Sequence, residues 1–118
     1  MVTGAHVVIY TKDAEADRKF FRDVLGLRSV DAGHGWLIFA LPAAEAAFHP
    51  GAQNNLHQMY LMCDNLKQQM AAWKKQGARF GEIAEEQWGT RTTILLPGGG
   101  VLGLYEPKHP VTFGGPRY

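Results

Sequence analysis

Cysteine is scarce in this chain of 118 residues, which contains only Cys63. A single thiol cannot close an internal disulfide, and it has no cysteine partner for a zinc knuckle. A chain without disulfides is typical of a reducing compartment. Because Cys63 ends a strand-like run, we expect it to be a small buried apolar residue.

An excess of charge and long apolar runs are also missing. The 12 basic and 11 acidic residues give a net charge of +1, and no basic run occurs. This balance excludes the electrostatic footprint of a protein that binds nucleic acid or an anionic membrane. No apolar run approaches the roughly eighteen residues of a membrane span, and no secretory signal opens the chain. We therefore expect a soluble cytoplasmic protein.

Two copies of one pattern are present in the chain. The segments GAHVVIYTKD (4–13) and NLHQMYLMCD (55–64) each combine a histidine, six strand-like residues and an aspartate. The offset between the copies is 51 residues (57 minus 6, and 64 minus 13), and it relates four identical pairs: His6 and His57, Asp13 and Asp64, Gly26 and Gly77, and Arg28 and Arg79. A fixed offset of this kind indicates a repeated supersecondary unit.

Each copy predicts the element order βαβββ. The β-branched and aromatic residues 5–10 predict a strand, and Asp13 predicts the cap of a helix that ends at Gly26. Further strand-like segments follow at 28–33, 35–42 and 45–50. The second copy predicts a strand at 56–63, a cap at Asp64, a helix ending at Gly77, and strands at 80–86, 90–97 and 101–107.

The two units are too small to bury a sheet face separately, so we expect them to pair in a single domain over residues 1–118. The first module covers about 4–50 and the second about 56–107. The Gly- and Pro-rich tail, 108–118, is predicted to be an irregular arm over a surface or a partner.

Three segments resemble the vicinal oxygen chelate superfamily, which includes glyoxalases, bleomycin resistance proteins and extradiol dioxygenases. They are HVVIYTKDAEADRKFFRDVLGL, HQMYLMCDNL and WGTR (88–91), in this order. The resemblance implies an α+β fold in which paired βαβββ modules form a curved eight-stranded open barrel around a cleft. It also implies a homodimer, in which the modules of the two chains are either exchanged or not.

The same resemblance implies a metal site. Metal-dependent members take one ligand from the first strand of each module, and His6 and His57 fall on these positions. Glu106 is the nearby acid that could serve as the third ligand and as the catalytic group. Two imidazoles and a carboxylate would leave open positions on Zn, Ni, Mn or Fe, where a substrate with adjacent oxygens could chelate.

The position of the carboxylate is ambiguous in this sequence. Counting from the glycine turn places the family's metal-binding glutamate at Gly103, whereas counting from Arg91 places it at Leu104. Glu106 shares strand parity with Leu104 but not with Gly103, and a shift of one residue reverses the face of every side chain. The equivalent position in the first module is His49, which is also not an acid.

Four residues are candidates for substrate binding. Arg91 and Trp88 precede the last hairpin, where the resemblance implies substrate contacts, and Trp36 and Tyr60 are strand aromatics that could line the cleft. The alternative for Arg91 is an ion pair with Glu85 or Glu86. The alternative for the aromatic residues is the core.

Two functions are therefore consistent with the sequence. One is a metal-dependent lyase or dioxygenase of the vicinal oxygen chelate type, acting on a small molecule with vicinal oxygens. The other is a metal-free protein of the bleomycin-resistance type that sequesters a planar or aromatic small molecule. The histidine pair favours the enzyme, and the missing last-strand glutamate favours the binding protein.

Overall fold

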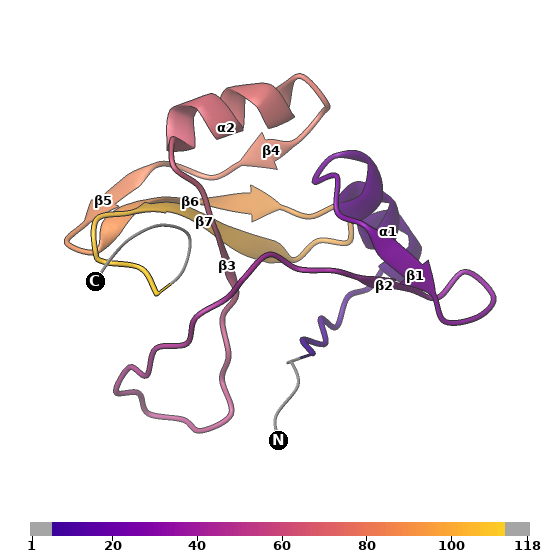
Figure 1. Cartoon of the computed structure of the whole chain (residues 1–118), viewed down its shortest axis with the longest axis horizontal. Helices are drawn as coiled ribbons and strands as arrows, with labels where there is room; N and C mark the ends of the chain where they lie inside the picture. Colours follow the sequence, from indigo (N-terminus) through magenta and orange to yellow (C-terminus); the bar gives the residue numbers. More distant parts are fainter. Residues whose placement is uncertain (1–5, 113–118) are drawn as a thin grey trace.

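The computed structural model of the chain describes residues 6–112. Its elements are, in order, α1 (Ala14–Asp23), β1 (Ser29–Asp31), β2 (Leu37–Phe39), β3 (Tyr60–Met62), α2 (Leu66–Lys74), β4 (Arg79–Phe80), β5 (Ala84–Glu86), β6 (Gly89–Leu95) and β7 (Val101–Pro107) (Figure 1). Two helices with mixed sheets confirm the predicted α+β class. No helix within residues 6–112 is long and apolar enough to cross a bilayer.

Helix α1 begins as the sequence predicts. The Asp13 carboxylate accepts a hydrogen bond from the Ala16 backbone N–H at 3.0 Å, which satisfies one of the free donors of the first turn. Phe20 and Phe21 are the buried apolar residues of the helix. The chain then turns at Gly26, whose φ of 71° is the left-handed conformation that glycine adopts without strain.

Helix α2 begins one residue later than predicted. Asn65, not Asp64, is the cap, because its side-chain oxygen accepts the Gln68 N–H at 3.0 Å. Leu66 and Met70 are the buried residues of this helix, and Gly77 ends the following turn at a φ of 94°.

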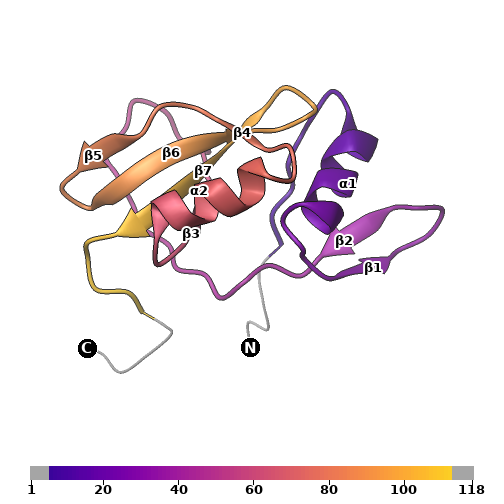
Figure 2. The ribbon, with the colours of Figure 1, turned by 90° about the horizontal axis from the view of Figure 1, so that it is seen from above.

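The second half of the chain forms a five-stranded sheet in the order β3–β7–β6–β4, with β5 also paired to β6. Strand β3 is parallel to β7, and the other neighbours are antiparallel. Helix α2 lies over one face of this sheet (Figure 2). This arrangement contains the strand, helix and hairpin of the predicted second module.

One hydrophobic core joins the two halves of the chain. It contains Phe20 and Phe21 from α1, Leu66 and Met70 from α2, and apolar residues of β6, β7 and the turn between them, namely Ile94, Leu96, Leu102 and Leu104. A polar contact supports the same junction, because the Gly98 N–H donates to Asp17 Oδ1 at 2.8 Å. Helix α1 is therefore attached to the β6–β7 turn of the other half.

The first half departs from the prediction. Residues 6–10 and 45–50 are not strands, and β1 and β2 pair only with each other. The described residues thus contain seven strands in two sheets and not eight strands in one barrel. The physical reason is that β propensity reflects how side chains fit a pleated surface, whereas a strand also needs a neighbour to bond its backbone.

Candidate functional site

The two faces of the five-stranded sheet have different roles. On β7, Leu102 and Leu104 are buried in the core beneath α2. Gly103 and Tyr105 alternate with them and therefore lie on the opposite face. This second face is not covered by α2, and we call it the open face.

The open face carries a cluster of three aromatic rings. Tyr60 on β3, Trp88 in the β5–β6 turn and Tyr105 on β7 have ring centroids 5.1–5.8 Å apart, and each pair is edge to face. Such pairs contribute about 0.5–1.5 kcal/mol each beyond the area that they bury. Tyr60 is 37% exposed and Tyr105 is 9% exposed, so the cluster has a buried floor and an accessible wall.

Gly103 lies directly under the ring of Tyr60. The two residues occupy paired positions of β3 and β7. A Cβ atom added at Gly103 would overlap the Tyr60 ring, with its Cγ at 2.7 Å. The ring thus fills the position at which one of the two sequence registers expected a metal-binding glutamate.

Arg91 extends the open face along β6, where it is paired with Tyr105. Its guanidinium lies 2.8 Å from the Glu86 carboxylate, and both side chains are about one-third exposed. The partner is one of the two acids that the sequence offered. Because the pair is internally neutral, this part of the face presents no free cation.

Glu106 lies on the α2 side of the sheet. Its Oε1 accepts the Leu66 backbone N–H at 2.9 Å, so the carboxylate satisfies a free donor in the first turn of α2 and stabilises the helix N-terminus. The buried position of Leu104 explains this orientation, because Glu106 is two residues further along the same strand. The structure therefore places Glu106 on the same face as Leu104, away from Gly103 and the open face.

The three residues expected to hold a metal are not gathered. His6 and His57 are both exposed and lie outside the strands. Within residues 6–112, no group of three His, Cys, Asp or Glu side chains is arranged to hold an ion. With Glu106 bonded to α2, the donors of one chain do not fit a divalent cation. Their role as metal ligands stays a prediction.

Cys63 offers no reactive thiol beside the cluster. Its Sγ lies 3.7 Å from the Tyr105 carbonyl oxygen, and burial raises the pKa of the thiol to about 11. The group is therefore protonated near neutral pH.

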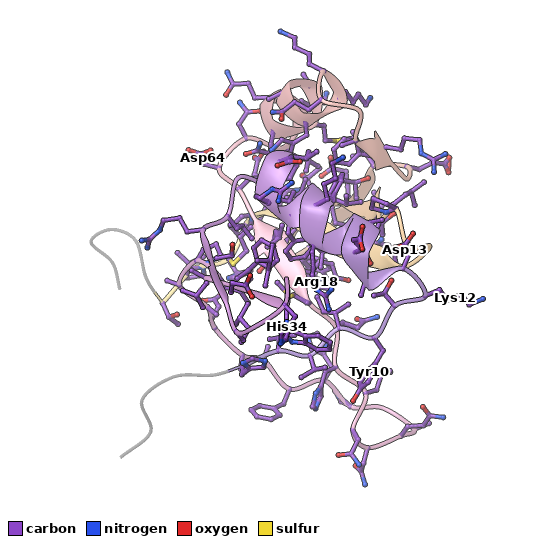
Figure 3. All side chains as sticks on the ribbon, turned by 90° about the vertical axis from the view of Figure 1, so that its right-hand side faces the viewer. Tyr10, Lys12, Asp13, Arg18, His34 and Asp64 are labelled. Carbon is purple, nitrogen blue, oxygen red and sulfur yellow. The ribbon has the colours of Figure 1, made fainter. Side chains whose placement is uncertain are left out.

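Trp36 lies apart from the three clustered aromatics. It precedes β2 and is 62% exposed, and the Arg18 guanidinium is 4.5 Å from its ring centroid. Arg18, a residue of α1, is labelled in Figure 3. Of the four predicted substrate-binding residues, the structure thus brings Tyr60, Trp88 and Arg91 to the open face and leaves Trp36 on the β1–β2 pair.

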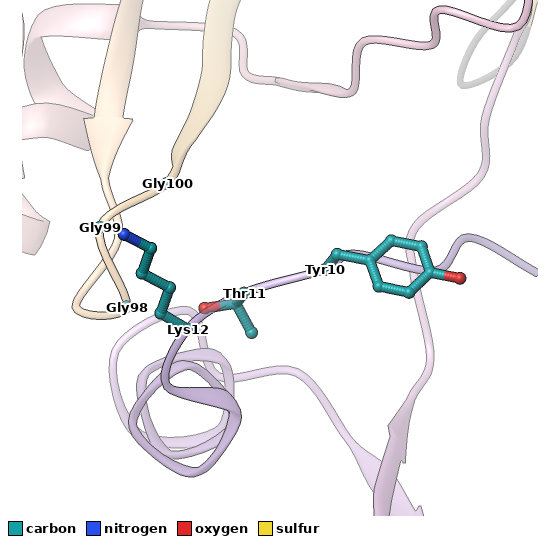
Figure 4. A pocket seen from close by; sticks show the side chains of 6 residues that line it. All are labelled: Tyr10, Thr11, Lys12, Gly98, Gly99 and Gly100. Atoms are coloured by element: carbon teal, nitrogen blue, oxygen red, sulfur yellow. The ribbon is translucent and has the colours of Figure 1, made fainter.

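A shallow hollow of about 440 Å³ lies at the β6–β7 turn, away from the aromatic cluster. Tyr10, Thr11 and Lys12 line one side of it, and the turn Gly98–Gly100 lines the other (Figure 4). It contains none of the predicted site residues.

Tyr105, His109 and Glu45 form a polar group that the sequence did not indicate. The Tyr105 hydroxyl is 2.9 Å from His109 Nε2, and Glu45 Oε1 is 4.0 Å from the same nitrogen. Burial raises the pKa of the Tyr105 phenol, which keeps the hydroxyl protonated. One indication of this group was present in the sequence, namely the strand alternation that puts Tyr105 on the same face of β7 as Gly103.

Several solved structures resemble this fold. TnmS3, an antibiotic binding protein from Streptomyces sp. CB03234, has a TM-score of 0.64 and 21% identity over 92% of this chain and 100% of its own. A lactoylglutathione lyase from Agrobacterium tumefaciens has a TM-score of 0.63 and 16% identity, over 88% of this chain and 92% of its own. A glyoxalase/bleomycin resistance protein, also from Streptomyces sp. CB03234, has a TM-score of 0.55 and 22% identity, over 80% and 92%.

A search of curated proteins gives no match. The model of the Glyoxalase/Bleomycin resistance protein/Dioxygenase superfamily, however, matches residues 4–109. This span includes both copies of the repeat and the whole open face, and it confirms the resemblance stated from the sequence. The chain belongs to the glyoxalase/bleomycin resistance protein/dioxygenase superfamily.

Proposed function

We propose that the protein binds a planar, largely neutral small molecule on the open face without a metal ion. The observation that carries this proposal is the Tyr60 ring over Gly103, because it puts an aromatic surface where a metal-dependent relative would need an acid. Trp88 supplies a second ring, and the Arg91–Glu86 pair leaves no free cation for an anionic ligand.

The complete site requires a second copy of the chain in this proposal. Residues 6–10 and 45–50 have strand-like sequences but no strand partner within the described chain, and Phe48 is 97% exposed. Exposed apolar segments of this kind mark surfaces that another chain covers. A homodimer in which these segments gain partners would complete the eight-stranded barrel around the open face.

Replacing Trp88 by alanine is expected to weaken ligand binding by at least about tenfold, which corresponds to about 1.4 kcal/mol. The reason is that an aromatic side chain at the centre of a binding surface commonly contributes more than this to the binding free energy. A panel of neutral polycyclic aromatic compounds would be titrated by calorimetry.

Trp36→Ala is the matched control, because Trp36 is also a partly exposed tryptophan but lies just before β2 of the other sheet. It should bind the same compound as tightly as the wild type. Equal losses in both variants, or no binding by any compound of the panel, would contradict the proposal.

The second candidate function is a metal-dependent lyase or dioxygenase, which the repeated pair His6 and His57 favours. In that case His6 and His57 would hold the ion, together with an acid that the single chain does not bring to them. Similarity in fold to a lactoylglutathione lyase is compatible with this function and does not establish it.

A metal titration separates the two candidates. For a metal-free protein, Ni, Mn, Fe or Zn should leave the melting temperature unchanged. For a metal site, an ion at a hundred times its dissociation constant would add about 2.7 kcal/mol to the free energy of unfolding. His57→Ala would abolish that gain, whereas His34→Ala, which removes an exposed loop histidine, would retain it.

A further inference from the structure

The segment after β7 turns back along the open face. In Figure 1 it is the yellow segment on the side of the sheet away from α2. We call residues 108–112 the strap. The His109 ring of the strap lies 5.9 Å from the Tyr105 ring, centroid to centroid, and Tyr105 is only 9% exposed, so the strap covers part of the floor of the aromatic cluster.

The first residue of the strap is fixed to the sheet. The Lys108 backbone N–H donates to the Trp88 carbonyl at 2.8 Å, and its Nζ is 2.8 Å from Glu85 Oε1. The ion pair is largely exposed and adds little. The backbone bond therefore defines where the strap begins.

The middle of the strap is held by a hydrogen bond of defined direction. His109 Nδ1 is 2.7 Å from the Pro110 carbonyl oxygen, which can only accept, so Nδ1 is the donor of this bond. With the ring proton on Nδ1, Nε2 accepts the hydrogen bond of the Tyr105 hydroxyl at 2.9 Å. The strap thus occupies the Tyr105 hydroxyl, the polar group at the floor of the cluster, in a hydrogen bond.

The end of the strap is held by Glu45, a residue of the first half of the chain. Its Oε2 accepts the Thr112 N–H at 2.9 Å and the Thr112 hydroxyl at 3.0 Å. The Thr112 N–H lowers the pKa of the Glu45 carboxyl, which therefore stays ionised. We call these two contacts the latch.

Beyond Lys108, the strap is held mainly by side-chain hydrogen bonds. The net contribution of each bond is modest, because water can replace it, and none of the strap residues is buried in the core. Opening the strap should therefore require less free energy than global unfolding.

We propose that the strap is a lid over the Tyr105 end of the open face, closed by the latch on Glu45, and that it opens as a unit while the sheet stays folded. Opening frees the Tyr105 hydroxyl. The statement that a ligand then uses this hydroxyl rests on the proposed function.

Limited trypsin digestion tests the lid without any ligand, because trypsin cleaves after lysine and the Lys108–His109 bond lies at the base of the strap. Glu45→Ala removes the latch and should raise the rate of cleavage after Lys108 at least about tenfold. Glu45→Gln retains an oxygen that can accept the Thr112 N–H and should give an intermediate rate. Glu82→Ala, at an exposed acid outside the strap contacts, should match the wild type.

Cleavage after Arg91, in the middle of β6, reports on unfolding of the sheet in the same digest. An increase confined to Lys108 supports the lid. Equal increases at Lys108 and Arg91, or no increase at Lys108, would overturn it. If a planar compound binds, Glu45→Ala should also speed its association; a lack of binding would count against the proposed function and leave the cleavage result intact.

Discussion

Val8→Asp is expected to convert the proposed homodimer into a monomer at micromolar concentration. Val8 is 62% exposed within the described chain, in the apolar segment 7–10 that has no strand partner there. If a second copy covers this segment, an aspartate would be buried without a partner charge, which is strongly unfavourable. The dimer dissociation constant should rise at least about tenfold, or about 1.4 kcal/mol. Light scattering after size exclusion would measure the change from twice the 13.1 kDa chain mass.

Val101→Asp is the matched control for this experiment. Val101 is also 62% exposed, but it lies at the start of β7, where Leu95 already pairs with it. This variant should remain dimeric. A wild-type protein that is monomeric at tens of micromolar, or two variants that dissociate equally, would refute the assignment of residues 6–10 to the interface.

The parts of the fold that depend on local chemistry could be predicted from the sequence. Asp13 caps α1 as expected, and Gly26 and Gly77 take the left-handed conformation that ends each helical segment. The span of β7, residues 101–107, also agrees with the prediction. In these cases the residue and its immediate neighbours contain the determining interaction.

The strands of the first half could not be predicted in the same way. Residues 6–10 have β-branched side chains, but whether they form a strand depends on a backbone partner distant in sequence or in another chain. The bond from the Leu66 N–H to Glu106 could not be predicted either, because Glu106 lies forty residues further along the chain.

The candidate site shows the same division. Alternation along β7 placed Gly103 and Tyr105 on one face. The sequence proposed four ligand contacts, Tyr60, Trp88, Arg91 and Trp36, and Trp36 lies apart from this face. The sequence could not decide which face of the sheet Glu106 occupies, because the two registers disagreed. The burial of Leu104 shows that Glu106 lies on the α2 side. The contacts of Glu45 with Thr112 and His109 connect segments that share no pattern, so no local signal could reveal them.

Gly103→Ala is expected to lower the free energy of unfolding by about 1–3 kcal/mol, the usual range for overpacking. The added methyl would overlap the Tyr60 ring, which Trp88 and Tyr105 hold edge to face. The ring must therefore leave the cluster, and ligand binding should weaken with it. Urea denaturation monitored by circular dichroism would give the change in free energy.

The double variant with Tyr60→Ala shows whether the ring is the cause. Without the ring, position 103 has room for a methyl group, so Gly103→Ala should cost less than about 0.5 kcal/mol in that background. The coupling energy would then fall within the 0.5–3 kcal/mol expected for residues in contact. An equal loss in both backgrounds would mean that backbone conformation, and not Tyr60, requires glycine at this position. A large coupling would instead establish that the aromatic ring fills the position where a metal-binding acid was expected, because a carboxylate is larger than the methyl group that the ring already rejects.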